Sequence, residues 1–156
     1  MINKKATLHL MVGLPGSGKT TKARDLSKQY NAIVFTPDIW QIKLFGQDAD
    51  DKDHDERHTK IEEIMWDLAK QMLARDQNII LDFGFWSKEE REYFRNEAKR
   101  LNVNFQIHFM NVPIEELRCR IENRNENLNE ATFLIEKSRI DEWAKIFTPP
   151  TDDELC

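Results

Sequence analysis

The sequence predicts a three-layer α/β/α fold, in which a parallel sheet lies between two layers of helices. Short apolar runs at residues 7–12, 32–35, 78–81 and 105–110 have the composition of strands that are buried on both faces. Longer segments lie between them, such as residues 57–75, where apolar residues recur every three or four positions as on one face of a helix. Strands that alternate with helices along a chain are typical of parallel sheets.

The most specific motif follows the first expected strand. Residues 13–20 read GLPGSGKT, which matches the phosphate-binding pattern G-x-x-x-x-G-K-T, and they hold three of the five glycines of the chain. Between a strand and a helix, such a P-loop holds a polyphosphate with its backbone amides. We expect Lys19 to contact the β- and γ-phosphates of ATP and Thr20 to bind Mg²⁺. The expected nucleotide-binding residues are Gly13, Pro15, Gly16, Ser17, Gly18, Lys19, Thr20 and Thr21.

Length and composition restrict the protein class. We expect one domain over residues 1–156, because this length suffices for a core of its own. No apolar run reaches the ~20 residues that a membrane span needs, and the net charge of −5 offers no overall basic field for nucleic acid. Cys119 and Cys156 match no disulfide or metal pattern, so we expect a cytoplasmic protein.

Several helices have recognisable ends. Ser87 and Glu90 form a capping box that opens a helix to about Arg100. Pro113 suits the first turn of the next helix. A last helix is expected from about Ala131 to Phe147, where it stops before a pair of prolines.

Two carboxylates follow expected strands at the sheet edge where open α/β folds bind ligands. Asp38, after the second strand, could accept the proton of a substrate hydroxyl; alternatively, it caps a helix that begins at Ile39. Asp82 directly follows the third strand and could hold Mg²⁺ with Thr20; alternatively, it is a turn residue before Gly84. The two roles could also be exchanged, since a sequence does not give distances.

Three arginines lie on or just after the helix that follows the fourth strand: Arg118, Arg120 and Arg124. Arg120 and Arg124 are one helical turn apart and share a face. In a lid over the nucleotide, such side chains could stabilise charge on the transferred phosphoryl group. The alternative is an exposed face whose arginines pair with neighbouring glutamates.

Other candidates also have two interpretations. Residues 53–58 read DHDERH, which could bind a metal but more often forms an exposed helix start, and His54 and Arg57 could contact substrate. His9 and His108 are expected in the core. Aromatic residues near the two aspartates could wall a pocket, with the two tryptophans as the best candidates, although core positions suit most of them: Trp40, Phe45, Phe83, Phe85 and Trp86.

A set of motifs along the chain resembles a known family. They are GLPGSGKTT at 13–21, PD at 37–38, HDER at 54–57, LDFGFW at 81–86, L-x-x-R-x-x-x-R-N at 117–125 and F-x-P-P-x-x-D-E-L at 147–155. Together they resemble the bacterial P-loop kinase-like proteins that are often labelled AAA-domain ATP-binding proteins. Relatives of that family include chloramphenicol phosphotransferase, zeta toxins and the kinase domain of polynucleotide kinases.

The resemblance implies an adenylate-kinase-like strand order, 2-3-1-4-5, and ATP-dependent phosphorylation of a hydroxyl. It assigns Asp38 to the position of the base and Arg120 and Arg124 to the lid. One residue departs from the pattern: relatives often have an arginine where this chain has Gln41. That difference weakens the case for an anionic substrate such as a polynucleotide.

Three functions compete on these observations. The first is a phosphotransferase that uses ATP and Mg²⁺ to phosphorylate a hydroxyl of an unidentified small molecule. The second is a kinase for the 5′-hydroxyl of a nucleoside or polynucleotide, which needs a local basic groove and a steep salt dependence. The third is a binding module that changes its lid conformation with ATP and does not turn over. A GTP-specific switch is disfavoured, because no Asn-Lys-x-Asp motif follows a later strand.

Overall fold

The central sheet is parallel and has the predicted order. The structure is a computed structural model that describes residues 4–47, 51–128 and 133–156. Its strands are β1 (Thr7–Val12), β2 (Ala32–Phe35), β3 (Asn78–Gly84) and β4 (Asn104–Phe109), in the order β2-β3-β1-β4. The α/β fold and the relative order of the first four strands are thereby confirmed. The described ranges contain no counterpart of a fifth strand in this sheet.

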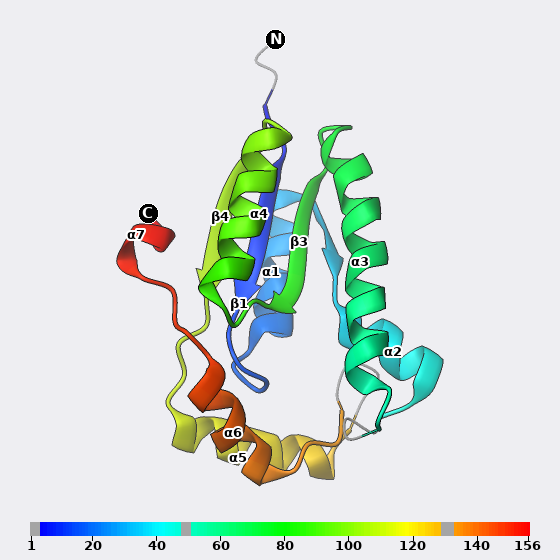
Figure 1. Cartoon of the computed structure of the whole chain (residues 1–156), viewed down its shortest axis with the longest axis vertical. Coiled ribbons are helices and arrows are strands. Elements are labelled where there is room, and N and C mark those ends of the chain that lie inside the picture. Colours follow the sequence, from blue (N-terminus) through cyan, green and yellow to red (C-terminus); the bar gives the residue numbers. More distant parts are fainter. Residues whose placement is uncertain (1–3, 48–50, 129–132) are drawn as a thin grey trace.

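Helices cover both faces of the sheet (Figure 1). The helices that flank it are α1 (Lys19–Tyr30), α3 (His54–Leu73) and α4 (Lys88–Arg100). Successive side chains of a strand point to opposite faces. Leu8 and Leu10 of β1 therefore belong to the core that α3 and α4 complete, whereas Met11 packs with Leu26 of α1. Within the described ranges, every helix is too short or too polar to span a bilayer.

Other helices lie near the carboxyl ends of the strands: α2 (Pro37–Phe45), α5 (Ile114–Glu126) and α6 (Lys137–Ile146). The short C-terminal helix is α7 (Asp152–Leu155). Figure 1 shows α5 and α6 crossing below the strand ends, while α7 lies beside β4. Leu14 of the P-loop packs in one apolar cluster with Leu117 and Ile121 of α5 and Ile140 of α6. This cluster places the lid helices over the loop.

The predicted cap of α4 is present. The Ser87 hydroxyl oxygen accepts a hydrogen bond from the backbone amide of Glu90, at 3.1 Å, and the helix ends at Arg100 as expected. An amide at a helix start has no partner within its own helix, so this bond stabilises the first turn.

The last large helix is shorter than the sequence predicted. The helix α6 begins at Lys137, whereas the expected helix began at Ala131, and residues 131–132 lie outside the described residues. Before α6, buried Phe133 and Ile135 alternate with exposed residues. The Asn125 side chain binds both the amide and the carbonyl of Ile135, at 3.0 and 2.6 Å. These bonds satisfy the backbone without a helix, so the apolar residues here do not share a helical face.

The C-terminal helix, which the sequence did not predict, is held by a buried ion pair. Arg91 of α4 contacts both carboxylate oxygens of Glu154 at 3.3 Å, and it also donates to the carbonyl of Phe85 at 2.9 Å. The side chains of Arg91 and Glu154 are only 1% and 7% exposed. Thr151 and Glu154 complete a capping box in the same turn. The chain end therefore supports the loop that follows β3.

Glu154→Gln is expected to destabilise the fold. The substitution keeps the shape of the side chain but leaves the Arg91 guanidinium buried without a counter-charge, which typically costs about 3–5 kcal/mol. Urea unfolding followed by circular dichroism measures the loss. Asp153→Asn, an exposed change in the same helix, is the matched control. Equal stability of the two variants would show that the pair contributes little.

Candidate active site

The P-loop has the backbone that a phosphate cradle needs. Gly16 and Gly18 have φ values of +82° and +92°, in the left-handed region that glycine adopts without strain. A Cβ on Gly16 would also lie 3.3 Å from the Cδ1 atom of Ile121 on α5. Gly18 occupies the N-cap position of α1, and no side chain caps that end. The first amides of α1 thus lie at the mouth of the loop without a side-chain cap, as in anion-binding helix starts.

Lys19 lies at the start of α1, and its ammonium group forms a hydrogen bond with the P-loop. Its Nζ donates to the carbonyl of Leu14 at 2.9 Å. Burial lowers the pKa of Lys19, and the carboxylates of Asp82 and Asp38 oppose that shift. A half-buried cation beside one carbonyl oxygen is well suited to exchange that partner for a more strongly charged phosphate oxygen.

Asp82 connects the P-loop to the neighbouring strand. Its Oδ2 accepts hydrogen bonds from the hydroxyl groups of Thr20 at 2.8 Å and Thr36 at 3.0 Å. Asp82 lies within β3, not after it, because the pairing with β1 continues to Gly84. It is therefore not a turn residue. Burial raises the pKa of Asp82, while the charge of Lys19 lowers it.

The oxygens around Asp82 fit a magnesium ion. Its Oδ1 is buried and has no hydrogen-bond partner among the described residues. The Thr20 hydroxyl is next to the same carboxylate. Mg²⁺ prefers oxygen ligands and is often held by one carboxylate together with phosphates and water. Thr20 and Asp82 could hold the ion in this way.

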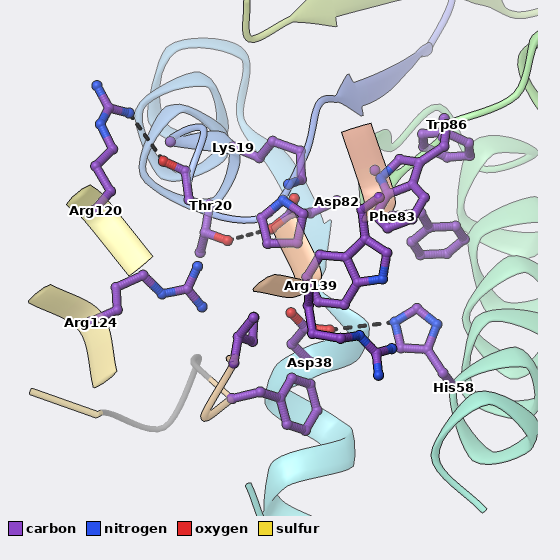
Figure 2. A pocket seen from close by; sticks show the side chains of 18 of the residues that line it. Lys19, Thr20, Asp38, His58, Asp82, Phe83, Trp86, Arg120, Arg124 and Arg139 are labelled. Atoms are coloured by element: carbon purple, nitrogen blue, oxygen red, sulfur yellow. Dashed lines mark hydrogen bonds and ion pairs between the residues drawn. The ribbon is translucent and has the colours of Figure 1, made fainter. Parts of the chain in front are cut away.

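Asp38 lies in the first turn of α2, two residues after the N-cap position of Thr36. The helix begins at Pro37, so the alternative that Asp38 caps a helix from Ile39 is wrong. The Asp38 carboxylate faces the same cavity as Lys19 and Asp82, and its Oδ1 lies 3.4 Å from Nε2 of His58 on α3 (Figure 2). A carboxylate in this place could accept a proton from a hydroxyl in the cavity.

The three arginines of α5 have different environments. Arg120 donates to the carbonyl of Gly16 at 3.1 Å and pairs with Glu116. Arg124 points toward the cavity between the P-loop and Asp38, as Figure 2 shows, and its Nε is buried with no hydrogen-bond partner among the described residues. Burial lowers the pKa of Arg124, and Asp38 opposes that shift. Arg118 pairs with Asp141 of α6 and does not line the cavity.

Arg124→Ala is expected to lower kcat for phosphoryl transfer by about 100-fold while changing the KM for ATP little. The reason is that a half-buried guanidinium directed at the cavity stabilises charge that develops in the transition state. Steady-state kinetics at several ATP concentrations measure both constants. Arg118→Ala is the control on the same helix. A lowered melting temperature with normal kinetics would assign Arg124 a structural role only.

One cavity of about 810 Å³ joins these groups. Phe83, Phe85 and Trp86 line it, as expected for an aromatic wall. Trp40 instead lines a separate pocket of about 130 Å³, and Phe45 is exposed beneath Arg57. Those two aromatic residues were therefore wrong candidates for this wall.

The sequence missed part of the wall: Phe133, Ile135, Arg139, Trp143 and Ile146. These residues come from α6 and the segment before it. All five fall within the helix that the sequence predicted from about Ala131 to Phe147, and none of them was a candidate for the site. Trp143 lies 5.7 Å from Trp86, between ring centres, and the Trp86 indole donates to the carbonyl of Gly13 at 3.3 Å, so this pair closes the cavity beside the start of the P-loop.

The histidine-rich start of α3 does not form a metal cluster in the described part of the chain. His54 accepts at its backbone carbonyl from Gln41 Nε2, at 2.9 Å, and both His54 and His58 line the cavity. His9 is buried as expected, whereas His108, also expected in the core, is only half-buried because β4 is an edge strand; Nδ1 of His9 lies 2.9 Å from Nε2 of His108. Burial lowers the pKa of His9 to about 4, so that the pair stays uncharged in the core.

Comparison with solved structures shows the same fold. The chain has a TM-score of 0.67 and 23% identity with a protein of the Pnkp1/Rnl/Hen1 RNA repair complex, over 92% of this chain and 44% of the other. It has a TM-score of 0.69 and 22% identity with Kti12 of Chaetomium thermophilum bound to ADP-AlF3, over 92% and 81%. For a gluconokinase of Sinorhizobium meliloti, the values are 0.62 and 13%, over 97% and 80%.

The chain therefore spans less than half the length of the RNA repair protein. No curated protein is significantly similar to it in sequence. The model of the family described as "AAA domain" matches residues 8–150, which include the P-loop, both aspartates and the lid helices. The chain belongs to this AAA-domain family and has a P-loop kinase-like fold.

Proposed function

We propose that the protein is a phosphotransferase that uses ATP and Mg²⁺ to phosphorylate a hydroxyl group of a small molecule. The carrying observation is that one cavity brings the P-loop lysine, a carboxylate–threonine pair and a second carboxylate together with a lid arginine. Lys19 and the Thr20–Asp82 pair are suited to binding a nucleotide with its metal ion, and Asp38 lines the same cavity. Residues 1–156 would form one catalytic domain.

In the proposed reaction, the oxygen of the acceptor hydroxyl attacks the γ-phosphorus of ATP. The bond between that phosphorus and the oxygen bridging to the β-phosphate breaks, so ADP leaves with the electron pair. Asp38 accepts the proton of the hydroxyl. Lys19 and Arg124 offset the negative charge on the phosphoryl oxygens, and the P-loop amides hold the β-phosphate. Arg120 would orient the loop through the carbonyl of Gly16.

Magnesium fits this assignment through Thr20 and the free oxygen of Asp82. When bound, Mg²⁺ supplies positive charge to the phosphate oxygens. Without it, the two buried oxygens of Asp82 would face the triphosphate with unfavourable charge. We therefore expect ATP binding to require a divalent cation, which titration calorimetry with and without EDTA measures.

A polynucleotide acceptor is the second candidate, because the fold resembles a protein of an RNA repair complex. The acceptor side of the cavity argues against it. Gln41 is buried and bonded to His54, so it does not present a donor to a phosphate. Asp55 and Glu90 also line this side. Carboxylates near the acceptor repel the backbone of a nucleic acid.

A transfer screen separates these functions. Labelled γ-phosphate of ATP is followed into small hydroxyl compounds, nucleosides and 5′-hydroxyl oligonucleotides, each with Mg²⁺ or EDTA. We expect a small compound to be labelled and the oligonucleotides to remain unlabelled. Labelled oligonucleotides with a steep salt dependence would favour the second candidate. ATP binding without transfer to any acceptor would support a binding switch instead.

A further inference from the structure

His58 lies between the carboxylates of Asp38 and Glu62. Its Nε2 is 3.4 Å from Oδ1 of Asp38, and its Nδ1 is 3.0 Å from Oε1 of Glu62, one turn farther along α3. Figure 2 shows the contact from His58 reaching one oxygen of the Asp38 carboxylate. Both ring nitrogens are thus engaged by acceptors, which requires that both carry a proton. The geometry is that of an imidazolium held by two anions.

The groups around His58 reinforce this charge state. His54 stacks against it, with ring centres 6.0 Å apart, and burial lowers the pKa of His54, so the neighbouring ring stays neutral. Glu90 of α4 adds negative charge near Glu62, whereas Arg139, which lines the same cavity, is the positive group that would oppose it. Although burial by itself would lower the pKa of His58, the bonds to Asp38 and Glu62 raise it to about 10.

We propose that His58, held by Glu62, is a positioning residue for Asp38. The inference rests on the proposed function, in which Asp38 is the base. With Oδ1 engaged by His58, the carboxylate cannot rotate freely about its side-chain bonds, and Oδ2 is the oxygen left for the acceptor hydroxyl. Glu62 does not line the cavity, so its effect on the reaction would pass through His58.

The pairing has a defined pH dependence. The pKa of His58 in the folded protein, about 10, is above its ordinary value of 6.5. The interaction therefore stabilises the fold fully below pH 6.5 and is lost as the pH rises through 10. Removing one of the two anions lowers the pKa of His58 and moves this loss to lower pH.

A nuclear magnetic resonance titration tests the pairing without any acceptor. The chain has four histidines, and His58→Asn assigns the resonance of His58 by its disappearance. We expect His58 to remain protonated well above pH 8 in the wild type and to titrate about 1–3 pH units lower in Glu62→Gln. Glu56→Gln is the matched control, because Glu56 lies on the same helix and pairs with Lys60 in solvent. A wild-type pKa near 6.5, or equal pKa values in the two variants, would overturn the proposal.

Kinetics then test the effect on catalysis, with water as the acceptor and ATP hydrolysis as the readout. We expect His58→Asn and Glu62→Gln to lower kcat by about 10- to 100-fold with little change in the KM for ATP, since only the orientation of the base is lost. In Glu62→Gln the alkaline limb of the kcat profile should move to lower pH. A structural loss alone would not move that limb.

The variant Asp38→Asn distinguishes a failure of the base assignment from a failure of the positioning role of His58. If Asp38→Asn hydrolyses ATP at the wild-type rate, Asp38 is not the base and the proposed function fails. If Asp38→Asn is impaired but His58→Asn is not, the base assignment stands and the positioning role is wrong. If His58→Asn and Glu62→Gln lower kcat equally and the double variant loses no more, the two residues act as one unit.

Discussion

Asp38→Asn should bind ATP with unchanged affinity and transfer phosphate about 100- to 10,000-fold more slowly than the wild type. The amide has nearly the same shape as the carboxylate but does not accept the proton of the hydroxyl. Asp38 lines the cavity from α2 and is not part of the P-loop, so the substitution should leave the triphosphate site intact. Single-turnover transfer to the acceptor found in the screen gives the rate, and calorimetry gives the affinity.

Asp55→Asn is the matched control for this substitution. Asp55 lines the same cavity from α3, and no hydrogen bond or ion pair joins it to Asp38 in the described part of the chain. It therefore removes one negative charge from the wall without removing the expected base. We expect its rate to stay within a few-fold of the wild type. Similar losses in the two variants would assign the effect to general charge, and near-normal turnover of Asp38→Asn would exclude it as the base.

Lys19→Ala should weaken ATP binding by at least about 10-fold and up to about 100-fold. Hydrogen bonds to a charged group contribute about 1.5–3 kcal/mol, and each 1.4 kcal/mol changes the dissociation constant tenfold. Lys19 is half-buried in the cavity, where its attraction to phosphate is screened less by water than at an open surface. Calorimetry with Mg²⁺ and a non-hydrolysable ATP analogue measures the loss.

Lys22→Ala controls for the loss of a positive charge on α1. Lys22 lies one turn after Gly18 and is exposed, so its removal should leave the affinity nearly unchanged. The ligand-free melting temperature of Lys19→Ala should stay near that of the wild type, because the lysine side chain makes one hydrogen bond to Leu14 and its burial is itself unfavourable. Unchanged ATP affinity in Lys19→Ala would refute the phosphate cradle.

Local patterns were sufficient wherever the physical cause is local. The P-loop requires glycine at two left-handed positions, Gly16 and Gly18, which are only two residues apart in the chain. Apolar runs identified all four strands. The central strands β1 and β3 are buried nearly throughout, as their composition predicted, whereas the edge strands β2 and β4 have exposed residues such as Ile33 and Asn104. Ser87 marked the start of α4, since a cap bonds to an amide three residues away. The position of Asp82 was misjudged by a few residues, because the end of β3 depends on its pairing with β1.

Patterns failed where the backbone finds partners far along the chain. The segment at 133–135 has the apolar content of a helix, yet Asn125 binds its backbone and holds it in another conformation. The helix α7 is too short to predict from periodicity, and it is held by Arg91, which lies 63 positions from Glu154. Trp143 and Trp86 come together only because α6 folds over the strand ends.

The sequence alone thus specified the P-loop and the parallel sheet, and it singled out Asp38 and Asp82 as candidates. Each of these predictions depends on neighbours within a few positions or on the composition of a strand. Packing specified which groups meet. Thr20 and Asp82 are 62 positions apart and share one hydrogen bond, and His58 reaches Asp38 only because α3 packs against α2. Such contacts depend on distances that the folded chain sets, and a carboxylate acquires its chemistry from the charges that are brought beside it.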